Sequence, residues 1–267
     1  MEKIGLIAGN RKFPLLFSEA AKKRGYSVVA IAIKKDTSPK LKGLVDKIYW
    51  LGLDEFSRMF EIFKAEGVSR VVMAGQISPH RLFSKEVTRD AELKKMLEGI
   101  EDKRADTIFG KIAEKLESSG FKLLDSTTFV EDYLPKKGVL TALEPGFSVW
   151  EDIYFGLNLA KAVSLLDIGQ SVAVKSKTVV AVEAFEGTDN LIRRSGKLAR
   201  GGITLVKVSK PKQDARFDIP VVGLKTIKTL ASAGGKCLAI EAGKTLFIDR
   251  DESIALAEKK GISIVAI

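Results

Sequence analysis

Short apolar runs alternate with amphipathic stretches of helical length through the first half of the chain. The runs KIGLIA (Lys3–Ala8), SVVAIAI (Ser27–Ile33) and SRVVMA (Ser69–Ala74) are rich in valine, isoleucine and alanine. Such runs are typical of strands that are buried on both faces of a sheet. Strands that alternate with helices predict βαβ units and a parallel sheet. We therefore expect a Rossmann-like α/β domain in this half.

The second half contains more strand-like segments, and a stretch rich in turn formers precedes it. LPKKG (residues 134–138) and LEPG (143–146) concentrate proline and glycine, which are typical of a linker. We expect a Rossmann-like N-terminal domain at 1–134, a linker at 135–146 and a C-terminal α/β catalytic domain at 147–267, richer in mixed β-structure.

The composition excludes chemistry that needs several thiols or imidazoles. The chain has one cysteine, Cys237, and one histidine, His80. It cannot build a disulfide framework, a cysteine-cluster metal site or a multi-histidine zinc site. Any catalysis must rely on carboxylates, lysines, arginines, hydroxyls and backbone amides.

The charge balance favours anionic partners. Lys and Arg number 44 against 34 Asp and Glu, a net charge of +10, which suits phosphorylated metabolites or an anionic membrane face. Nucleic acid is not an expected partner, because aromatic residues make up only 7% and are not interleaved with basic ones. No apolar window is long enough for a membrane span or a signal peptide, so we expect a cytoplasmic protein.

Two loops follow predicted strands at the carboxyl edge of the first sheet, where open α/β sheets bind ligands. In the first, the backbone amides from Gly9 to Arg11 and the following helix N-terminus suit a phosphate. A full dinucleotide glycine fingerprint is absent, which disfavours NAD. In the second loop, Gln76 and His80 are candidate substrate donors. The alternatives are an ordinary turn and a surface histidine without a role.

The sequence EAFEGTDNLIRR gathers three carboxylates around one turn, at Glu183, Glu186 and Asp189. We expect Thr188, after Gly187, to cap a helix that carries Arg193, whose guanidinium can pair with a phosphate. The alternative is a capped helix with solvated arginines.

The sequence KPKQDARFDIPVVG (Lys210–Gly223) has the most distinctive spacing. If it is extended, Asp214, Arg216 and Asp218 point to one face, with the carboxylates ~7 Å apart. These carboxylates can bind Mg²⁺ while Arg216 pairs with phosphate, and Lys207 and Lys210 add positive charge. The alternative is a ladder of surface salt bridges.

Two long motifs carry a resemblance to a known family. Residues Gly169–Arg194 (GQSVAVKSKTVVAVEAFEGTDNLIRR) and Gly201–Gly223 (GGITLVKVSKPKQDARFDIPVVG) resemble the UDP-2,3-diacylglucosamine pyrophosphatases of the LpxI type. The similarity extends to GLIAGN and MAGQISP in the first half, so it covers nearly the whole chain. The first loop is less glycine-rich than is usual in the family.

The resemblance implies a Mg²⁺-dependent hydrolase of lipid A biosynthesis that converts UDP-2,3-diacylglucosamine to UMP and 2,3-diacylglucosamine 1-phosphate (lipid X). It also implies a homodimer of two-domain chains, with either Asp214 or Asp218 essential. We assign catalysis to Asp214, Arg216 and Asp218, and metal binding to Asp214 and Asp218, with Glu183 and Asp189 as further candidates. Candidate substrate-binding residues are Gly9, Asn10, Gln76, His80, Glu186, Gly187, Thr188, Asp189, Arg193, Lys207, Lys210 and Gln213.

A lipid-linked substrate leads to further expectations. We expect the N-terminal domain to contribute binding and not chemistry, and the acyl chains to occupy an apolar pocket in the C-terminal domain or between the domains. Peripheral contact with the inner membrane leaflet is compatible with the positive charge. The alternative function is a lipid- or nucleotide-sugar-binding protein that does not hydrolyse its ligand.

Overall fold

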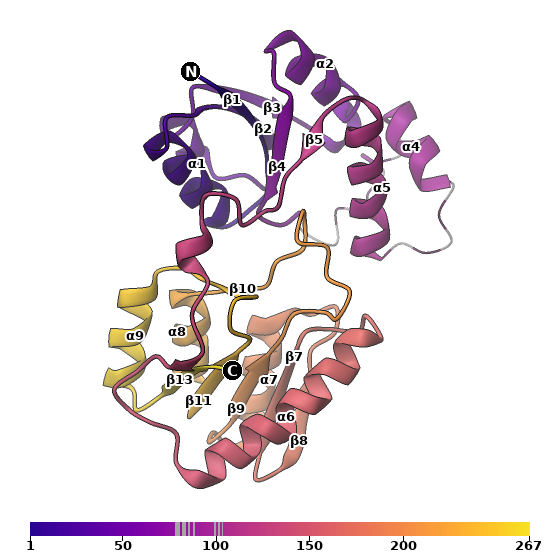
Figure 1. Cartoon of the computed structure of the whole chain (residues 1–267). Helices are drawn as coiled ribbons and strands as arrows, with labels where there is room; N and C mark the ends of the chain where they lie inside the picture. The colour runs from indigo at the N-terminus through magenta and orange to yellow at the C-terminus, as the bar shows by residue number, and fades with distance from the viewer. Residues whose placement is uncertain are drawn as a thin grey trace. The chain divides into compact units, whose positions relative to one another are not determined.

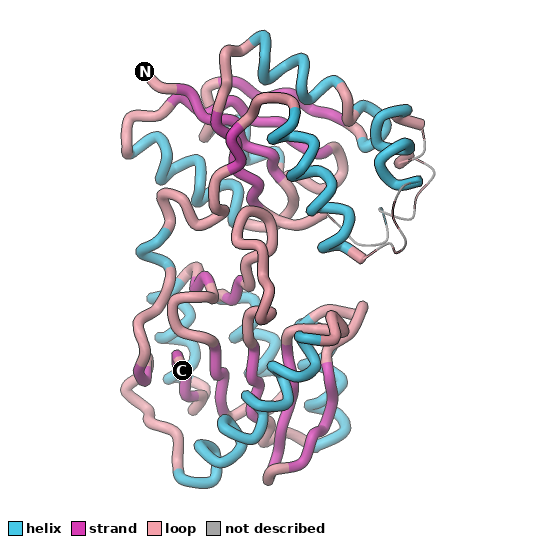
Figure 2. Tube along the Cα trace, turned by 45° about the vertical axis from the view of Figure 1, so that its right-hand side comes forward, coloured by secondary structure: helices cyan, strands magenta, loops and turns pink. Residues whose placement is uncertain are grey.

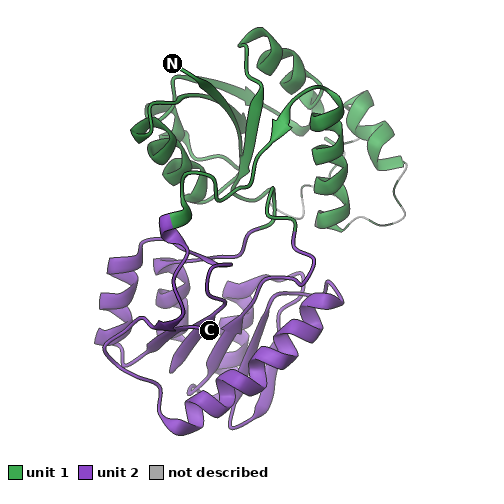
Figure 3. Cartoon of the chain, in the orientation of Figure 1, with its two compact units in different colours: residues 1–131, 214–218 green, residues 132–213, 219–267 purple. Residues whose placement is uncertain are grey.

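The chain folds into two compact units (Figure 3). The structure, a computed structural model, describes residues 1–77, 81, 84, 86–87, 89–98, 100, 102 and 104–267. The first unit comprises Met1–Glu131 and Asp214–Asp218, and the second comprises Asp132–Gln213 and Ile219–Ile267. Five residues of the second half therefore pack with the first unit.

The first unit is built on a five-stranded sheet with the order β3-β2-β1-β4-β5, in which every neighbouring pair is parallel (Figure 1). This order confirms the Rossmann-like expectation. Its strands are β1 (Lys3–Ala8), β2 (Ser27–Ile33), β3 (Lys47–Leu51), β4 (Arg70–Ala74) and β5 (Lys122–Leu123). Its helices are α1 (Phe13–Lys23), α2 (Arg58–Ala65), α4 (Ala91–Glu98) and α5 (Ala105–Ser118), with 3₁₀ turns at Pro39–Gly43 and Leu53–Glu55.

The two faces of this sheet are covered by different helices. Ile4, Leu6 and Ala8 of β1 are fully buried on one face, and α1 packs against β2 and β4. On the other face, β2 and β4 share an apolar core with Phe63 of α2 and Leu116 of α5. Burial on both faces explains why these strands are apolar almost throughout.

The second unit is built on a six-stranded mixed sheet with the order β6-β13-β11-β9-β7-β8. Figure 2 shows the strands in magenta and the helices in cyan. The neighbours β13, β11 and β9 run parallel, whereas β6, β7 and β8 pair antiparallel with their neighbours. The strands are β6 (Gly138–Val139), β7 (Ser171–Lys175), β8 (Thr178–Val182), β9 (Thr204–Lys207), β11 (Cys237–Ile240) and β13 (Ser263–Ala266). Strands β10 (Val221–Val222) and β12 (Leu246–Phe247) form a separate parallel pair.

Helices cover both faces of this second sheet. Helix α6 (Phe147–Leu165) packs on one face through a core that includes Ile153 and Ala160. On the other face lie α7 (Thr188–Ala199), α8 (Leu224–Ser232) and α9 (Arg250–Lys259). The mixed α/β class is confirmed. None of the helices in the described residues is long and apolar enough to cross a membrane.

Two segments differ from the sequence expectations. The expected linker includes β6, which pairs with β13 at the edge of the second sheet. The chain between β10 and β11 also contains α8, which the sequence analysis did not identify.

Two helical glycines allow a matched test of the packing. An added Cβ on Gly156 of α6 would lie 2.7 Å from Val206 Cγ2, whereas one on Gly110 of α5 would meet nothing within 4 Å. We expect Gly156→Ala to lower the free energy of unfolding by about 1–3 kcal/mol through overpacking. Gly110→Ala should raise it by about 0.5–1 kcal/mol, because alanine favours the helix. Urea unfolding measures both values, and equal effects would contradict the close packing of α6 on its sheet.

Candidate functional site

The segment that carries Asp214, Arg216 and Asp218 is a turn and not an extended strand. The amides of Phe217 and Asp218 both donate to the Asp214 carbonyl, at 3.2 and 3.0 Å, as in one turn of helix. The Arg216 amide donates to Asp214 Oδ1 at 3.0 Å, an Asx turn that favours this geometry. The prediction of three side chains on one face of a strand is wrong. On a helical turn, Asp214 and Asp218 share a side because they are four residues apart.

This turn is anchored in the first unit. The Ser126 amide donates to the Ala215 carbonyl at 2.9 Å, and Ser126 Oγ lies 2.9 Å from the Arg216 carbonyl. The rings of Phe217 and Phe109 of α5 pack with centroids 6.1 Å apart. The candidate catalytic residues, which were expected in the C-terminal domain, therefore belong to the first unit.

Arg216 is held between two carboxylates. Its Nε and Nη2 donate to Asp214 at 2.9 and 2.6 Å, and its Nη1 donates to Glu117 at 2.7 Å. The guanidinium lowers the pKa of Asp214, and the carboxylates raise the pKa of Arg216. A guanidinium has five N–H groups. Within the described residues, Nη1 and Nη2 each use one N–H group in these bonds. The second N–H group on each nitrogen can therefore donate to a phosphate oxygen.

The backbone amides of the first loop are already used within the unit. Gly9 donates to the Ala74 carbonyl and Asn10 to the Gln76 carbonyl, each at 2.8 Å. A Cβ on Gly9 would lie 2.6 Å from the Gln76 backbone nitrogen. Gly9 is therefore required for the close approach of two loops. The expectation of phosphate binding is therefore wrong for the amides of Gly9 and Asn10, and for the Arg11 amide it stays a prediction. Gly9→Val would disturb the loops themselves.

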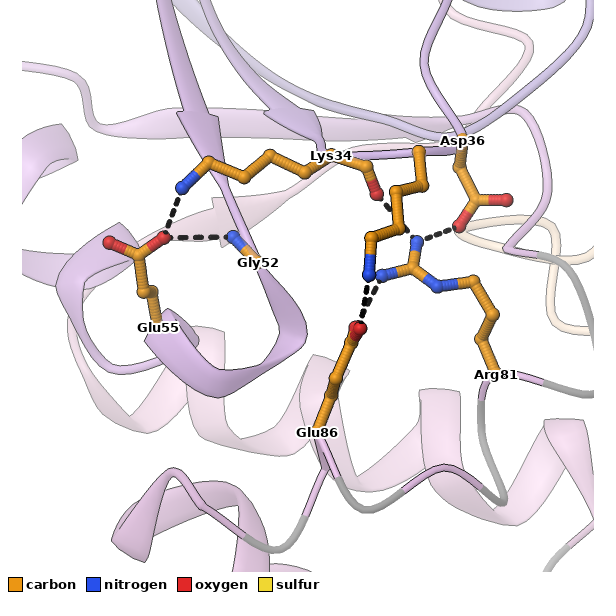
Figure 4. Close-up of polar contacts among 7 residues, drawn as sticks. Lys34, Asp36, Gly52, Glu55, Arg81 and Glu86 are labelled. Carbon is orange, nitrogen blue, oxygen red and sulfur yellow. Dashed lines mark hydrogen bonds and ion pairs between the residues drawn. The ribbon is translucent and has the colours of Figure 1, made fainter.

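A buried ion pair occupies the edge that follows β2 (Figure 4). Arg81 lies 2.5 Å from Asp36 and 2.7 Å from Glu86, and the Asp36 side chain is only 1% exposed. A buried pair of this kind is costly to break, so we assign it a structural role. In a dinucleotide-binding domain, an acidic residue in this region binds the ribose of the ligand. Here the acidic residue, Asp36, is paired with Arg81 instead. His80 lies outside the described residues.

In the second unit, a polar chain joins three predicted residues at one edge of the sheet. Lys207 at the end of β9 donates to Thr188 Oγ1 at 2.8 Å, and Thr188 donates to Glu183 Oε1 at 2.8 Å. The N-cap of α7 is Gly187, without a side-chain cap. The prediction that Thr188 caps the helix is wrong, because its hydroxyl bonds Glu183.

Buried polar atoms without partners lie at the same edge. Glu183 Oε2, Ser171 Oγ and Gln213 Nε2 have no hydrogen-bond partner in the described part of the chain. Ser171 pairs with Lys207 in the sheet, and the Glu183 amide donates to the Ser171 carbonyl at 2.9 Å. Buried polar groups are normally satisfied, so orphan atoms indicate a place for water, an ion or a ligand.

The remaining predicted residues of this edge already have partners within the second unit. These pairs are Glu186 with Arg194, Asp189 with Lys225, Arg193 with Asn190, Lys210 with Asp167, and the Lys210 amide with Gln213 Oε1. No group of three His, Cys, Asp or Glu residues could hold a metal ion among the residues that the structure describes. The carboxylates of EAFEGTDNLIRR therefore do not form a metal cage by themselves.

Glu241, which follows β11, is a further polar residue that the sequence analysis missed. It accepts hydrogen bonds from Lys161 at 2.6 Å and from the Ser209 hydroxyl at 2.9 Å, and it pairs with Lys244. Burial would raise its pKa, but these hydrogen bonds outweigh burial and lower the pKa to about 2.

This shift predicts a pH dependence of stability. The ordinary pKa of Glu241 is 4.5 and the folded value is about 2. Its stabilising contribution is therefore complete above pH 4.5 and is lost as the pH falls toward 2. We expect Glu241→Gln to lower the free energy of unfolding of the second unit by about 2–3 kcal/mol at neutral pH. In urea unfolding, the difference from wild type should shrink toward pH 2. A difference independent of pH would contradict the assignment.

Similarities to solved structures are weak. The biotin carboxylase domain of Hydrogenobacter thermophilus 2-oxoglutarate carboxylase aligns with a TM-score of 0.29 and 14% identity, over 77% of this chain and 44% of that chain. Phosphoribosylglycinamide synthetase from Anaerococcus prevotii aligns with a TM-score of 0.26 and 11% identity, over 67% and 38%. Alignments this weak carry no inference about fold or function.

Sequence comparison is decisive. Residues 3–133 match the LpxI N-terminal domain, and residues 136–265 match the LpxI C-terminal domain. The UDP-2,3-diacylglucosamine pyrophosphatase LpxI of Caulobacter vibrioides is 30% identical over 278 residues, covering 100% of this chain and 98% of the relative. With both domains matched and a full-length relative aligned, the chain belongs to the LpxI family.

Proposed function

We propose that this chain hydrolyses the diphosphate of UDP-2,3-diacylglucosamine, a step of lipid A biosynthesis. Water adds to one phosphorus and the bond from that phosphorus to the bridging oxygen breaks, so UMP and 2,3-diacylglucosamine 1-phosphate each keep one phosphate. The observation that carries the proposal is the Asp214–Asp218 turn, which holds two carboxylates and an arginine in a chain aligned end to end with a pyrophosphatase.

The side chains suit this reaction. Diphosphate hydrolysis depends on charge stabilisation at phosphate oxygens and on a positioned water, and it needs neither histidine nor thiol. The unused donors of Arg216 would bind a phosphate oxygen, with orientation fixed by Asp214 and Glu117. In the second unit, Lys207 supplies a cation that is connected through Thr188 to Glu183, whose other carboxylate oxygen has no partner in the described part of the chain.

Mg²⁺ is part of the proposal, and the donor set on the turn fits it. Mg²⁺ is usually bound by one or two carboxylates, with substrate phosphates and waters completing the shell. Asp214 and Asp218 share one side of the turn and would supply that pair, because a carboxylate bonded to an arginine keeps lone pairs for a metal. Arg216 is already neutralised by Asp214 and Glu117, so the turn needs further positive charge to attract a diphosphate. Bound Mg²⁺ would supply that charge and polarise the phosphoryl group. Glu183 and Asp189 stay as further candidate ligands.

The cellular setting is also proposed. We place the enzyme in the cytoplasm with peripheral contact at the anionic inner leaflet, supported by the net charge of +10. We propose a homodimer, which sedimentation velocity tests.

Release of UMP is the direct test. Purified protein with UDP-2,3-diacylglucosamine should release UMP in the presence of Mg²⁺ and not with a chelator. Asp214→Asn and Asp218→Asn should each lower kcat, at least one by roughly 10³-fold, the scale of losing a metal ligand or key electrostatic group.

Asp251→Asn, at an exposed position in α9, is the matched control and should leave kcat unchanged. Binding of the substrate without any UMP release would favour the non-hydrolytic alternative. Near-normal kcat in both turn variants would show that the reaction uses other carboxylates.

A further inference from the structure

The first unit contains an apolar cavity of about 50 Å³. It lies on the α2 and α5 side of the sheet, and its lining includes Ile7 of β1, Met73 of β4, Leu97 of α4 and Phe109 of α5. All the described residues around it are isoleucine, leucine, valine, methionine or phenylalanine. Such a lining offers no hydrogen-bond partner to water, so the cavity suits an apolar ligand.

A cavity of this size is unusual in a protein interior. Interiors rarely contain voids larger than one water molecule, whereas this one has room for about three or four water-sized groups. Ile7 lies on the central strand but is only half-buried, while its neighbours Leu6 and Ala8 are fully buried. Leu97 and Phe109 are also half-buried. The cavity therefore borders residues that solvent can reach.

One wall of the cavity adjoins the candidate catalytic turn. Phe109 lines the cavity and also packs against Phe217, at a centroid distance of 6.1 Å. Phe217 lies between Arg216 and Asp218 in the chain. All of these residues belong to the first unit. If the phosphate of a substrate binds at this turn, the pair Phe217 and Phe109 separates it from the apolar cavity.

We propose that this cavity receives the terminal methylene groups of one acyl chain of the substrate. The proposal rests on the proposed function, since a diacylated sugar nucleotide carries a diphosphate and apolar chains in one molecule. A methylene group takes up about as much space as a water molecule, so the cavity holds about three or four of them. It places acyl recognition in the N-terminal unit, which revises the expectation of a pocket in the C-terminal domain or between domains.

The cavity makes chain length measurable in the kinetics. Burial of one methylene is worth about 0.8 kcal/mol, or roughly fourfold in kcat/KM. For UDP-2,3-diacylglucosamine with progressively shorter acyl chains, kcat/KM should fall roughly fourfold per methylene over the last few methylenes and then level off. Leu97→Trp should fill the cavity, lowering kcat/KM for the long-chain substrate about tenfold or more while the short-chain substrate is unaffected.

The control is Met96→Trp, on the same helix and half-buried but not among the residues around the cavity. It should keep the wild-type dependence on chain length. The same dependence in Leu97→Trp and wild type would overturn the proposal, and so would a wild-type kcat/KM independent of chain length. In both cases UMP release would still support the proposed function.

A binding measurement decides the matter without turnover. Long-chain 2,3-diacylglucosamine 1-phosphate should shift the methyl NMR signals of Ile7, Ile108 and Ile112, which border the cavity. A short-chain analogue should leave them in place, and Ile227 in the second core should not respond to either compound. Binding of the long-chain compound without these shifts would overturn the proposal even if no UMP is released from any substrate.

Discussion

One buried hydroxyl links the N-terminal sheet to the candidate catalytic turn. Ser126 is 1% exposed, and its Oγ lies 2.8 Å from the Met73 carbonyl of β4 and 2.9 Å from the Arg216 carbonyl. Its amide also donates to the carbonyl of Ala215. Since buried carbonyls must find donors, this serine fixes the backbone from which Asp214 and Asp218 project. The placement of the carboxylate pair and of Phe217 beside the apolar cavity depends on this link.

This link changes which of the two units holds the candidate catalytic residues. The sequence puts Asp214–Asp218 deep in the C-terminal half, but packing puts it in the unit that also holds the cavity. The second unit supplies a different set of groups, in which Lys207, Thr188 and Glu183 form a polar chain beside unsatisfied atoms. We therefore assign the carboxylate chemistry and an acyl chain to the first unit, and further polar recognition to the second.

The regular parts of the fold could be predicted from sequence because each is a local pattern. Strands β1 and β2 have the predicted bounds, since runs such as KIGLIA and SVVAIAI fit a buried strand and little else. The alternation D-A-R-F-D was ambiguous: it fits a strand, but Asp214 also favours an Asx turn, and hydrogen bonds to Ser126 select the turn. Glu117 and Ser126 could not be found from sequence, because they lie about 90 residues or more from Arg216 and match no motif.

A double-mutant cycle between Ser126 and Asp214 tests most directly whether docking of the turn organises the site. Ser126→Ala should lower kcat. Ser18→Ala should not, because this buried serine of the same unit donates its hydroxyl to the Pro14 carbonyl within α1. Because Ser126 acts through the turn, the double variant should lose little more activity than Asp214→Asn alone. Losses that multiply, or a Ser126→Ala variant with unchanged kcat, would contradict the dependence of the carboxylates on this serine.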